Sequence, residues 1–159
     1  KEDVLAFRNS SWMTDGANLL LIGDTGLGKS HTVKALCHDA ILAGHSAVFI
    51  TAFDLISKIK KAANLAAKVE YYGNVVRVLA IDELGYTAHS REEGDILFQI
   101  ISKRSERFST LITTNLAPKH WGSIFSGPAA SAILDRLSYK GTILKLEGDK
   151  SYRPTAKRK

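Results

Sequence analysis

The chain has 159 residues, of which 45% are hydrophobic and 24% are charged, and its formal net charge at pH 7 is +6. A chain of this length forms one ordinary domain and buries about 70% of its unfolded surface without disulfides. No apolar run approaches the roughly 20 residues that span a bilayer, and the single cysteine, Cys37, excludes an internal disulfide. We therefore expect a cytoplasmic globular protein without a membrane partner, whose positive charge permits binding to nucleic acid.

Strand and helix patterns alternate along the first third of the chain. A short helix is expected over residues 1–15, with Gly16 ending it. The solidly apolar run 18–22 predicts a strand buried on both faces, as parallel strands are. Apolar residues at helical spacing between Val33 and Ile41 then predict a helix that stops near Gly44.

A second strand is predicted over 47–50, and Thr51 is the expected cap of the helix that follows. This helical region carries four lysines, which are Lys58, Lys60, Lys61 and Lys68. Two interpretations stay open: a solvated helix face, or a surface that meets DNA phosphates.

A third strand is predicted over 75–81, directly before Asp82 and Glu83. Ser90 and Glu93 have the spacing of a capping box, so a helix is expected to begin there.

The last third of the chain repeats the alternation. A fourth strand is expected over 110–114, and Pro118 is expected to stop regular structure. A short helix over 131–137 and a fifth strand over 142–146 follow. Strands alternating with helices predict an α/β fold with a five-stranded parallel sheet.

The stretch from Gly23 to Ser30 reads G-x-x-x-x-G-K-S and lies between a predicted strand and a predicted helix. In that context the pattern is typical of a P-loop, whose backbone N–H groups point toward a bound phosphate. Lys29 would reach the phosphates of ATP or ADP, and the Ser30 hydroxyl would ligate Mg²⁺. A glycine-rich turn with a stray lysine is the alternative. The predicted nucleotide contacts of this segment are Gly23, Asp24, Thr25, Gly26, Leu27, Gly28, Lys29, Ser30 and His31.

Two acids follow the third predicted strand, at the edge where parallel sheets bind ligands. Adjacent buried carboxylates are unfavourable unless a cation offsets their charge, so Asp82 is expected to hold Mg²⁺ beside Ser30. Glu83 would then orient the water that attacks the γ-phosphate. The alternative is that the two acids merely begin an ordinary loop.

Two further polar residues are candidates for catalysis. Asn115 follows the fourth predicted strand, where its amide could hydrogen-bond the γ-phosphate or the attacking water. Spacing alone favours a turn asparagine ahead of Pro118. Arg136 by itself reads as a surface arginine of a helix. Phosphoryl transfer, however, often uses an added guanidinium, which a neighbouring subunit can supply.

Taken together, these motifs resemble the AAA+ ATPase domain of the IstB-like transposition helper proteins, which are relatives of the DnaC helicase loaders and the DnaA initiators. The resemblance covers almost the whole chain. Its most specific parts are Leu84-Gly85-Tyr86, Trp121-Gly122 and Ser151-Tyr152-Arg153. It implies a three-layer P-loop NTPase fold over residues 1–149 and a basic tail over 150–159. The sequence has no room for a helical lid after Leu146, so we expect the lid to be reduced or absent.

The resemblance also implies a role for each candidate residue. Lys29 and Ser30 match Walker A, and Asp82 and Glu83 match Walker B. Asn115 matches sensor 1, Arg136 an arginine finger that acts across a subunit interface, and Arg153 a sensor 2 arginine that contacts the nucleotide.

The function implied is that of a bacterial ATPase that assembles head-to-tail on double-stranded DNA and regulates or delivers a transposase. A loader of a replicative helicase shares every ATP-site residue and is the alternative. A nucleotide-dependent scaffold with little turnover is a third interpretation, which Glu83 disfavours. Family members usually carry an N-terminal region that recruits the partner, and we expect this chain to be the ATPase core without it.

Overall fold

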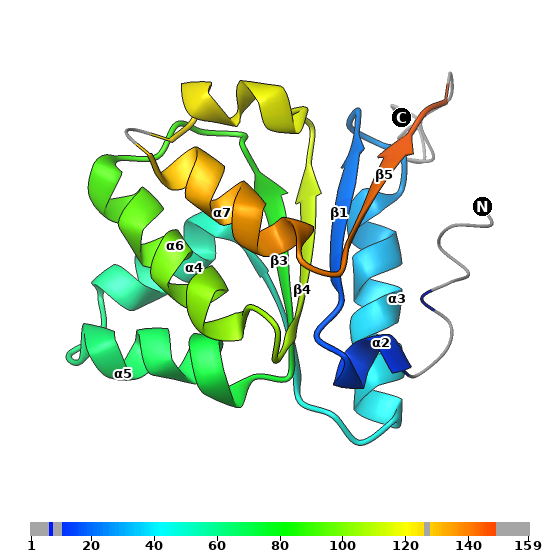
Figure 1. The fold of residues 1–159 in the computed structure, drawn as a ribbon, viewed down its shortest axis with the longest axis horizontal. Coiled ribbons are helices and arrows are strands. Elements are labelled where there is room, and N and C mark those ends of the chain that lie inside the picture. The colour runs from blue at the N-terminus through cyan, green and yellow to red at the C-terminus, as the bar shows by residue number, and fades with distance from the viewer. Residues whose placement is uncertain (1–6, 8–10, 126–127, 149–159) are drawn as a thin grey trace, which may run out of the picture.

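The computed structural model describes residues 7, 11–125 and 128–148. Its centre is a sheet of five parallel strands in the order β2-β3-β4-β1-β5 (Figure 1). This confirms the predicted five-stranded parallel α/β fold. The strands are β1 (Asn18–Gly23), β2 (Ala47–Thr51), β3 (Val78–Leu84), β4 (Ser109–Thr114) and β5 (Gly141–Leu146).

Helices cover both faces of the sheet and complete a three-layer arrangement (Figure 1). One face carries α2 (Ser11–Thr14) and α3 (Lys29–Leu42). The other carries α4 (Ala52–Lys60), α5 (Leu65–Glu70), α6 (Arg91–Arg104) and α7 (Ala129–Ser138). Two short helical segments join these elements: the π-helical turn Tyr71–Val75 and the 3-10 helix Pro118–Ser123. No helix in the described part of the chain is both long and apolar enough to cross a membrane.

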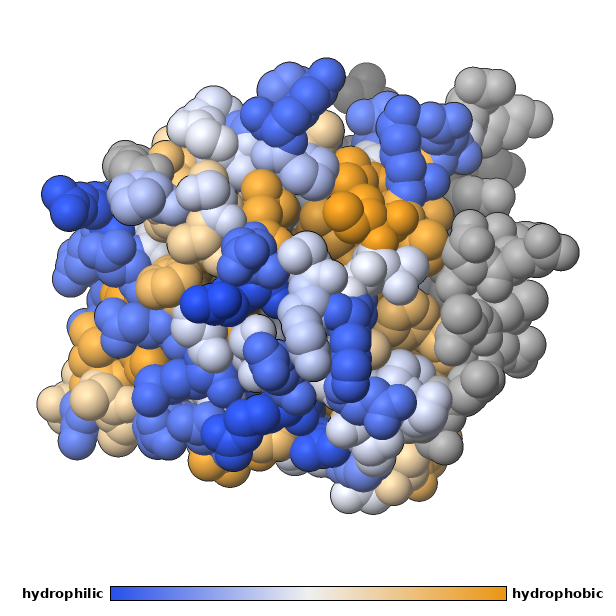
Figure 2. Space-filling model, in the orientation of Figure 1, coloured by the Kyte–Doolittle hydropathy of each residue, from blue (hydrophilic) through white to orange (hydrophobic). Residues whose placement is uncertain are grey.

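Each face of the sheet has its own apolar core, because successive strand residues point to opposite sides. In β1, Leu19 and Leu21 pack with α3, whereas Leu20 and Ile22 pack with the helices of the other face. Cys37 of α3 is buried in the first of these cores, and burial raises the pKa of its thiol to about 11. A thiol with that pKa is uncharged at neutral pH and therefore unreactive. At the sheet edge, β5 leaves Ile143 exposed, and apolar side chains gather over β1 and β5 in Figure 2.

The predicted helix caps are confirmed. The Thr51 hydroxyl accepts a hydrogen bond from the Asp54 N–H at 3.1 Å and begins α4. Ser90 accepts from the Glu93 N–H at 3.3 Å, while the Glu93 carboxylate accepts from the Ser90 N–H at 3.0 Å. This reciprocal pair is the capping box of α6, and it fixes the chain between β3 and α6.

Two boundary predictions are wrong. The third strand does not cover 75–81: it begins at Val78, because residues 71–75 form the π-helical turn, and it continues through both acids to Leu84. Pro118 does not stop regular structure but begins a 3-10 helix. A first helical position suits proline, because that residue needs no N–H partner. Within the expected helix over 1–15, the described helix is Ser11–Thr14, and residues 1–6 and 8–10 lie outside the described residues.

A buried arginine near the end of α6 hydrogen-bonds the segment before β3 and the first residues of β4. The Arg104 side chain is fully buried, and its guanidinium donates five hydrogen bonds. The acceptors are the Thr110 hydroxyl and the backbone carbonyls of Tyr72, Val76, Arg77 and Ser109. Burial lowers the pKa of Arg104 to about 9, so it stays charged at neutral pH. The Arg104 guanidinium thus provides hydrogen-bond donors for three backbone carbonyls in the irregular segment that leads into β3.

Replacing Arg104 with leucine should destabilise the fold strongly, because it removes the guanidinium that donates to four backbone carbonyls at a largely buried position. We expect the free energy of unfolding to fall by about 3 to 5 kcal/mol, as when a buried charged network is broken. Urea denaturation measures this loss. The neighbouring Lys103→Ala variant, which breaks only an exposed ion pair with Glu70, should lose far less. Similar losses for both variants would contradict this role of Arg104.

Candidate functional site

The predicted P-loop connects β1 to α3 at the carboxyl edge of the sheet, where the strands end in Figure 1. Gly26 and Gly28 have φ angles of 92° and 85°, in the left-handed region that favours glycine. At Gly23 the constraint is space, because a Cβ there would lie 2.6 Å from the Leu146 carbonyl oxygen of β5. The glycines therefore let the backbone curl tightly beside its neighbouring strand.

The Lys29 side chain lies inside this curled loop. It is 6% exposed, and its amine donates to the carbonyl oxygens of Gly23 at 2.6 Å and of Asp24 at 2.8 Å. Lys29 also begins α3, whose N-terminus adds partial positive charge. The loop thus combines a cation with a helix end, an arrangement suited to anions such as phosphate.

Asp82 and Ser30 come together because of strand register. In β3, Val78 and Ala80 face α3, so the two-residue period places Asp82 on the same side. There the Ser30 hydroxyl donates to Asp82 Oδ1 at 2.9 Å. Asp82 itself is buried, at 5% exposure. The structure therefore brings the two residues predicted to hold Mg²⁺ into direct contact.

Thr113 is a site residue that the sequence interpretation missed. Leu111 of β4 packs on the α3 side, and the same two-residue period places Thr113 there beside Asp82. The Thr113 hydroxyl donates to Asp82 Oδ1 and accepts from the Glu83 N–H at 3.0 Å. The signal in the sequence is a hydroxyl residue at the end of an apolar strand, two residues before the candidate Asn115.

Glu83 departs from regular strand geometry. Its φ is +59°, and the pairing of β3 with β4 shifts register between Ile81 and Leu84. Such a bulge re-aims a side chain at a strand end. Glu83 is exposed, unlike the rest of β3, so its carboxylate is available at the carboxyl edge of the sheet.

After this bulge, Tyr86 contacts the P-loop. The Tyr86 hydroxyl lies 2.9 Å from the Thr25 hydroxyl, within hydrogen-bond distance. The segment after Glu83 is thus tied to the middle of the loop predicted to hold the phosphates.

Three further predicted site residues are Asn115, His31 and Arg153. Asn115 is exposed and follows directly after β4, at the same edge as Asp82. His31 is exposed in the first turn of α3. Arg153 and the predicted tail over 150–159 lie outside the described residues.

Arg136 lies far from the P-loop of its own chain. It is exposed in α7, 3.1 Å from Asp135 Oδ2. Its carbonyl accepts from the Asn18 side chain at 3.4 Å. Asn18 begins β1, whereas the P-loop follows its end, and five residue steps of a strand span about 17 Å. Within one chain the structure does not bring Arg136 to the other candidate residues.

The donor set fits a nucleotide with Mg²⁺. Hydroxyl and carboxylate oxygens are the ligands that Mg²⁺ prefers, completed by phosphate oxygens and water. The described residues hold no cluster of three or more His, Cys, Asp or Glu side chains that would bind a metal alone. A site that shares its metal with phosphates needs only the pair that Ser30 and Asp82 form.

Comparisons with known proteins identify the family to which the chain belongs. Residues 1–159 match the family described as IstB-like ATP binding protein. A protein of insertion sequence IS21 from Pseudomonas aeruginosa, named for ATP binding, is 37% identical over 89% of this chain and 54% of its own length. A protein of insertion sequence IS232 from Bacillus thuringiensis subsp. berliner, named likewise, is 32% identical over 96% of this chain and 62% of its own length. The chain thus spans somewhat more than half of these relatives.

Solved structures share the fold. The crystal structure of DnaI gives a TM-score of 0.78 at 21% identity, over 96% of this chain and 84% of that one. That of the DnaC helicase loader gives 0.73 at 22% identity, over 92% and 89%. AMPPCP-bound DnaA from Aquifex aeolicus gives 0.73 at 18% identity, over 96% and 46%.

These structural likenesses confirm the predicted P-loop fold of AAA+ type, and the match over all 159 residues extends the agreement to the sequence. The chain therefore belongs to the family of IstB-like ATP-binding proteins.

Proposed function

We propose that the chain is the ATPase core of a helper protein that assembles on double-stranded DNA and regulates or delivers a transposase. The observation that carries the ATPase part is the contact of Ser30 with the buried Asp82, with Glu83 exposed beside it. A protein that only retains a nucleotide has no use for a second carboxylate re-aimed at the same edge. This feature favours hydrolysis over a static scaffold.

Each residue has a distinct part in the proposed hydrolysis. Lys29 and the P-loop N–H groups bind the phosphates, and Ser30 and Asp82 hold Mg²⁺, directly or through water. Bound there, Mg²⁺ would supply positive charge beside the phosphate oxygens. Glu83 orients the attacking water, and Thr113 holds both acids in place through its two hydrogen bonds. Asn115 senses the γ-phosphate, and Arg153 contacts the nucleotide.

Arg136 requires a second subunit. Its position beside the start of β1 supports action on the nucleotide of a neighbouring chain rather than its own. Head-to-tail contacts of this kind repeat from subunit to subunit and produce rings or open helices. The apolar surface over β1 and β5 lies next to α7, where burial against a second copy would stabilise such a contact (Figure 2).

The choice of partner rests on the relatives. Proteins at 32% to 37% identity are named for insertion sequences, which supports a transposase as the partner. Loading of a replicative helicase is the second candidate, because the DnaC helicase loader shares the fold. Association of the full-length protein with a transposase and with a replicative helicase, measured side by side, separates the two.

Glu83→Gln tests the hydrolytic assignment. The amide cannot accept the proton of the attacking water, so we expect ATP to bind with unchanged affinity while turnover stops. Because ATP then persists, the variant should remain assembled on double-stranded DNA. Phosphate release and sedimentation with DNA measure the two effects. Turnover equal to that of the wild type would show that Glu83 is not the base.

Arg136→Ala tests action between subunits. We expect intact ATP binding with turnover lowered by about 10³-fold or more, as when an arginine finger is lost. Mixing this variant with Lys29→Ala should restore part of the activity, because one chain then supplies the nucleotide site and the other the guanidinium. If no mixing ratio restores turnover, Arg136 does not act in trans.

A further inference from the structure

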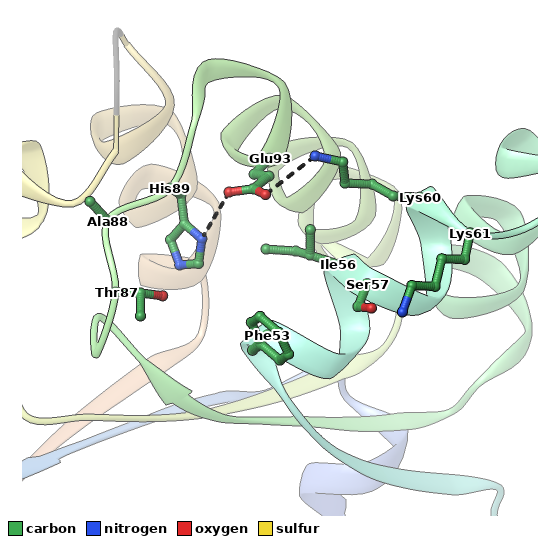
Figure 3. A pocket seen from close by; sticks show the side chains of 9 residues that line it. All are labelled: Phe53, Ile56, Ser57, Lys60, Lys61, Thr87, Ala88, His89 and Glu93. Carbon is green, nitrogen blue, oxygen red and sulfur yellow. Dashed lines mark hydrogen bonds and ion pairs between the residues drawn. The ribbon is translucent and has the colours of Figure 1, made fainter.

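A cavity opens near the carboxyl edge of the sheet, between α4 and the segment 87–89 (Figure 3). Its volume is about 400 Å³, within the range of small-molecule sites. One wall is a stripe along α4 and its C-cap, formed by Phe53, Ser57 and Lys61 at helical spacing. None of these residues has a part in the proposed hydrolysis.

The α4 wall combines an aromatic ring with a cation. Phe53 is 70% exposed, although it borders the cavity, so one face of its ring is open to a ligand. Lys61 lies two helical turns further along. No carboxylate of the described residues lies within ion-pairing distance of its amine, and the Ser57 hydroxyl lies between the two (Figure 3). Proteins hold unpaired nucleotides by stacking each base on an aromatic side chain and placing positively charged side chains beside the phosphates.

The opposite wall is rigid and carries little net charge. The His89 N–H donates to the Ile124 carbonyl at 2.6 Å, and the His89 ring stacks on Phe125 with centroids 5.2 Å apart. Burial lowers the pKa of His89 more than Glu93 raises it, so the ring is neutral at pH 7. Lys60 lies 3.4 Å from the Glu93 carboxylate and offsets its charge. Lys61 is therefore the cation that a phosphate would meet at this cavity.

From these walls we propose that the cavity holds one unpaired nucleotide of the DNA to which the protein binds, with the base against Phe53 and the phosphate at Lys61 and Ser57. The inference rests on the proposed DNA binding and adds to it a site for a nucleotide outside the duplex. The α4 wall begins directly after β2, whose Thr51 pairs with Asp82, and the opposite wall follows Glu83. The site is thus built on the two strands that carry the nucleotide edge.

Fluorescence anisotropy with two labelled DNAs tests the proposal: a plain duplex, and the same duplex with a short single-stranded tail, each in the presence of a non-hydrolysable ATP analogue. We expect the wild type to bind the tailed DNA more tightly. Phe53→Ala should lose about tenfold in affinity for the tailed DNA, the typical effect of one stacked base, with duplex affinity unchanged. Lys61→Ala should weaken tail binding and lower its salt dependence by about one released counterion.

Lys58→Ala is the matched control. Lys58 lies in the last turn of α4, three residues before Lys61, and is exposed, but it does not border the cavity. Its loss removes the same charge and should leave the preference for the tail intact. ATP affinity without DNA, unchanged in all three variants, reports that the fold is intact.

Three results would overturn the inference. Equal binding of tailed DNA by Phe53→Ala and the wild type would do so and leave the proposed function standing. Loss of transposase association by Phe53→Ala, with both DNA affinities unchanged, would show a peptide site instead. Failure of the wild type to bind either DNA would overturn the inference together with the proposed DNA-binding function.

Discussion

The hydrogen bond from Ser30 to Asp82 is the contact on which the rest of the site depends. It joins the first turn of α3 to the end of β3, across the intervening strand β4, whose Thr113 contacts the same carboxylate oxygen. A buried carboxylate is unfavourable without such partners, and hydrogen bonds to charged groups contribute about 1.5 to 3 kcal/mol each. The sheet order therefore matters to function because it makes these three elements neighbours at one edge.

Within a single chain, the candidate residues Glu83 and Arg136 are placed very differently. Glu83 adopts a left-handed conformation that costs about 1 to 3 kcal/mol in a non-glycine residue, and such outliers gather at functional sites. Its orientation is held by the Thr113 hydroxyl and by the bulge in β3. Arg136, in contrast, lies near the other end of β1. For the proposed function, a fold that orients Glu83 itself but presents Arg136 elsewhere is suited to turnover that waits for assembly.

Much of this arrangement could be predicted from the sequence, because its signals are local. Apolar runs marked the five strands, and the spacing of Gly23, Lys29 and Ser30 marked the P-loop. What depends on contacts between distant segments could not be predicted. β3 begins later than predicted because Arg104 stabilises a π-helical turn before it. Thr113 contacts Asp82 and Glu83 only because of the strand register. The cavity beside Phe53 forms between residues 53–61 and residues 87–93, two segments more than twenty residues apart.

Calorimetric titration of the folded protein with ATP and Mg²⁺ tests the central claim most directly, because every proposed role depends on a nucleotide held between the P-loop and Asp82. The account predicts saturable binding of one nucleotide per chain, weakened when Mg²⁺ is chelated and greatly weakened in Asp82→Ala. An absence of saturable heat with the folded wild type, or binding of Mg-ATP by Asp82→Ala as tight as by the wild type, would contradict it.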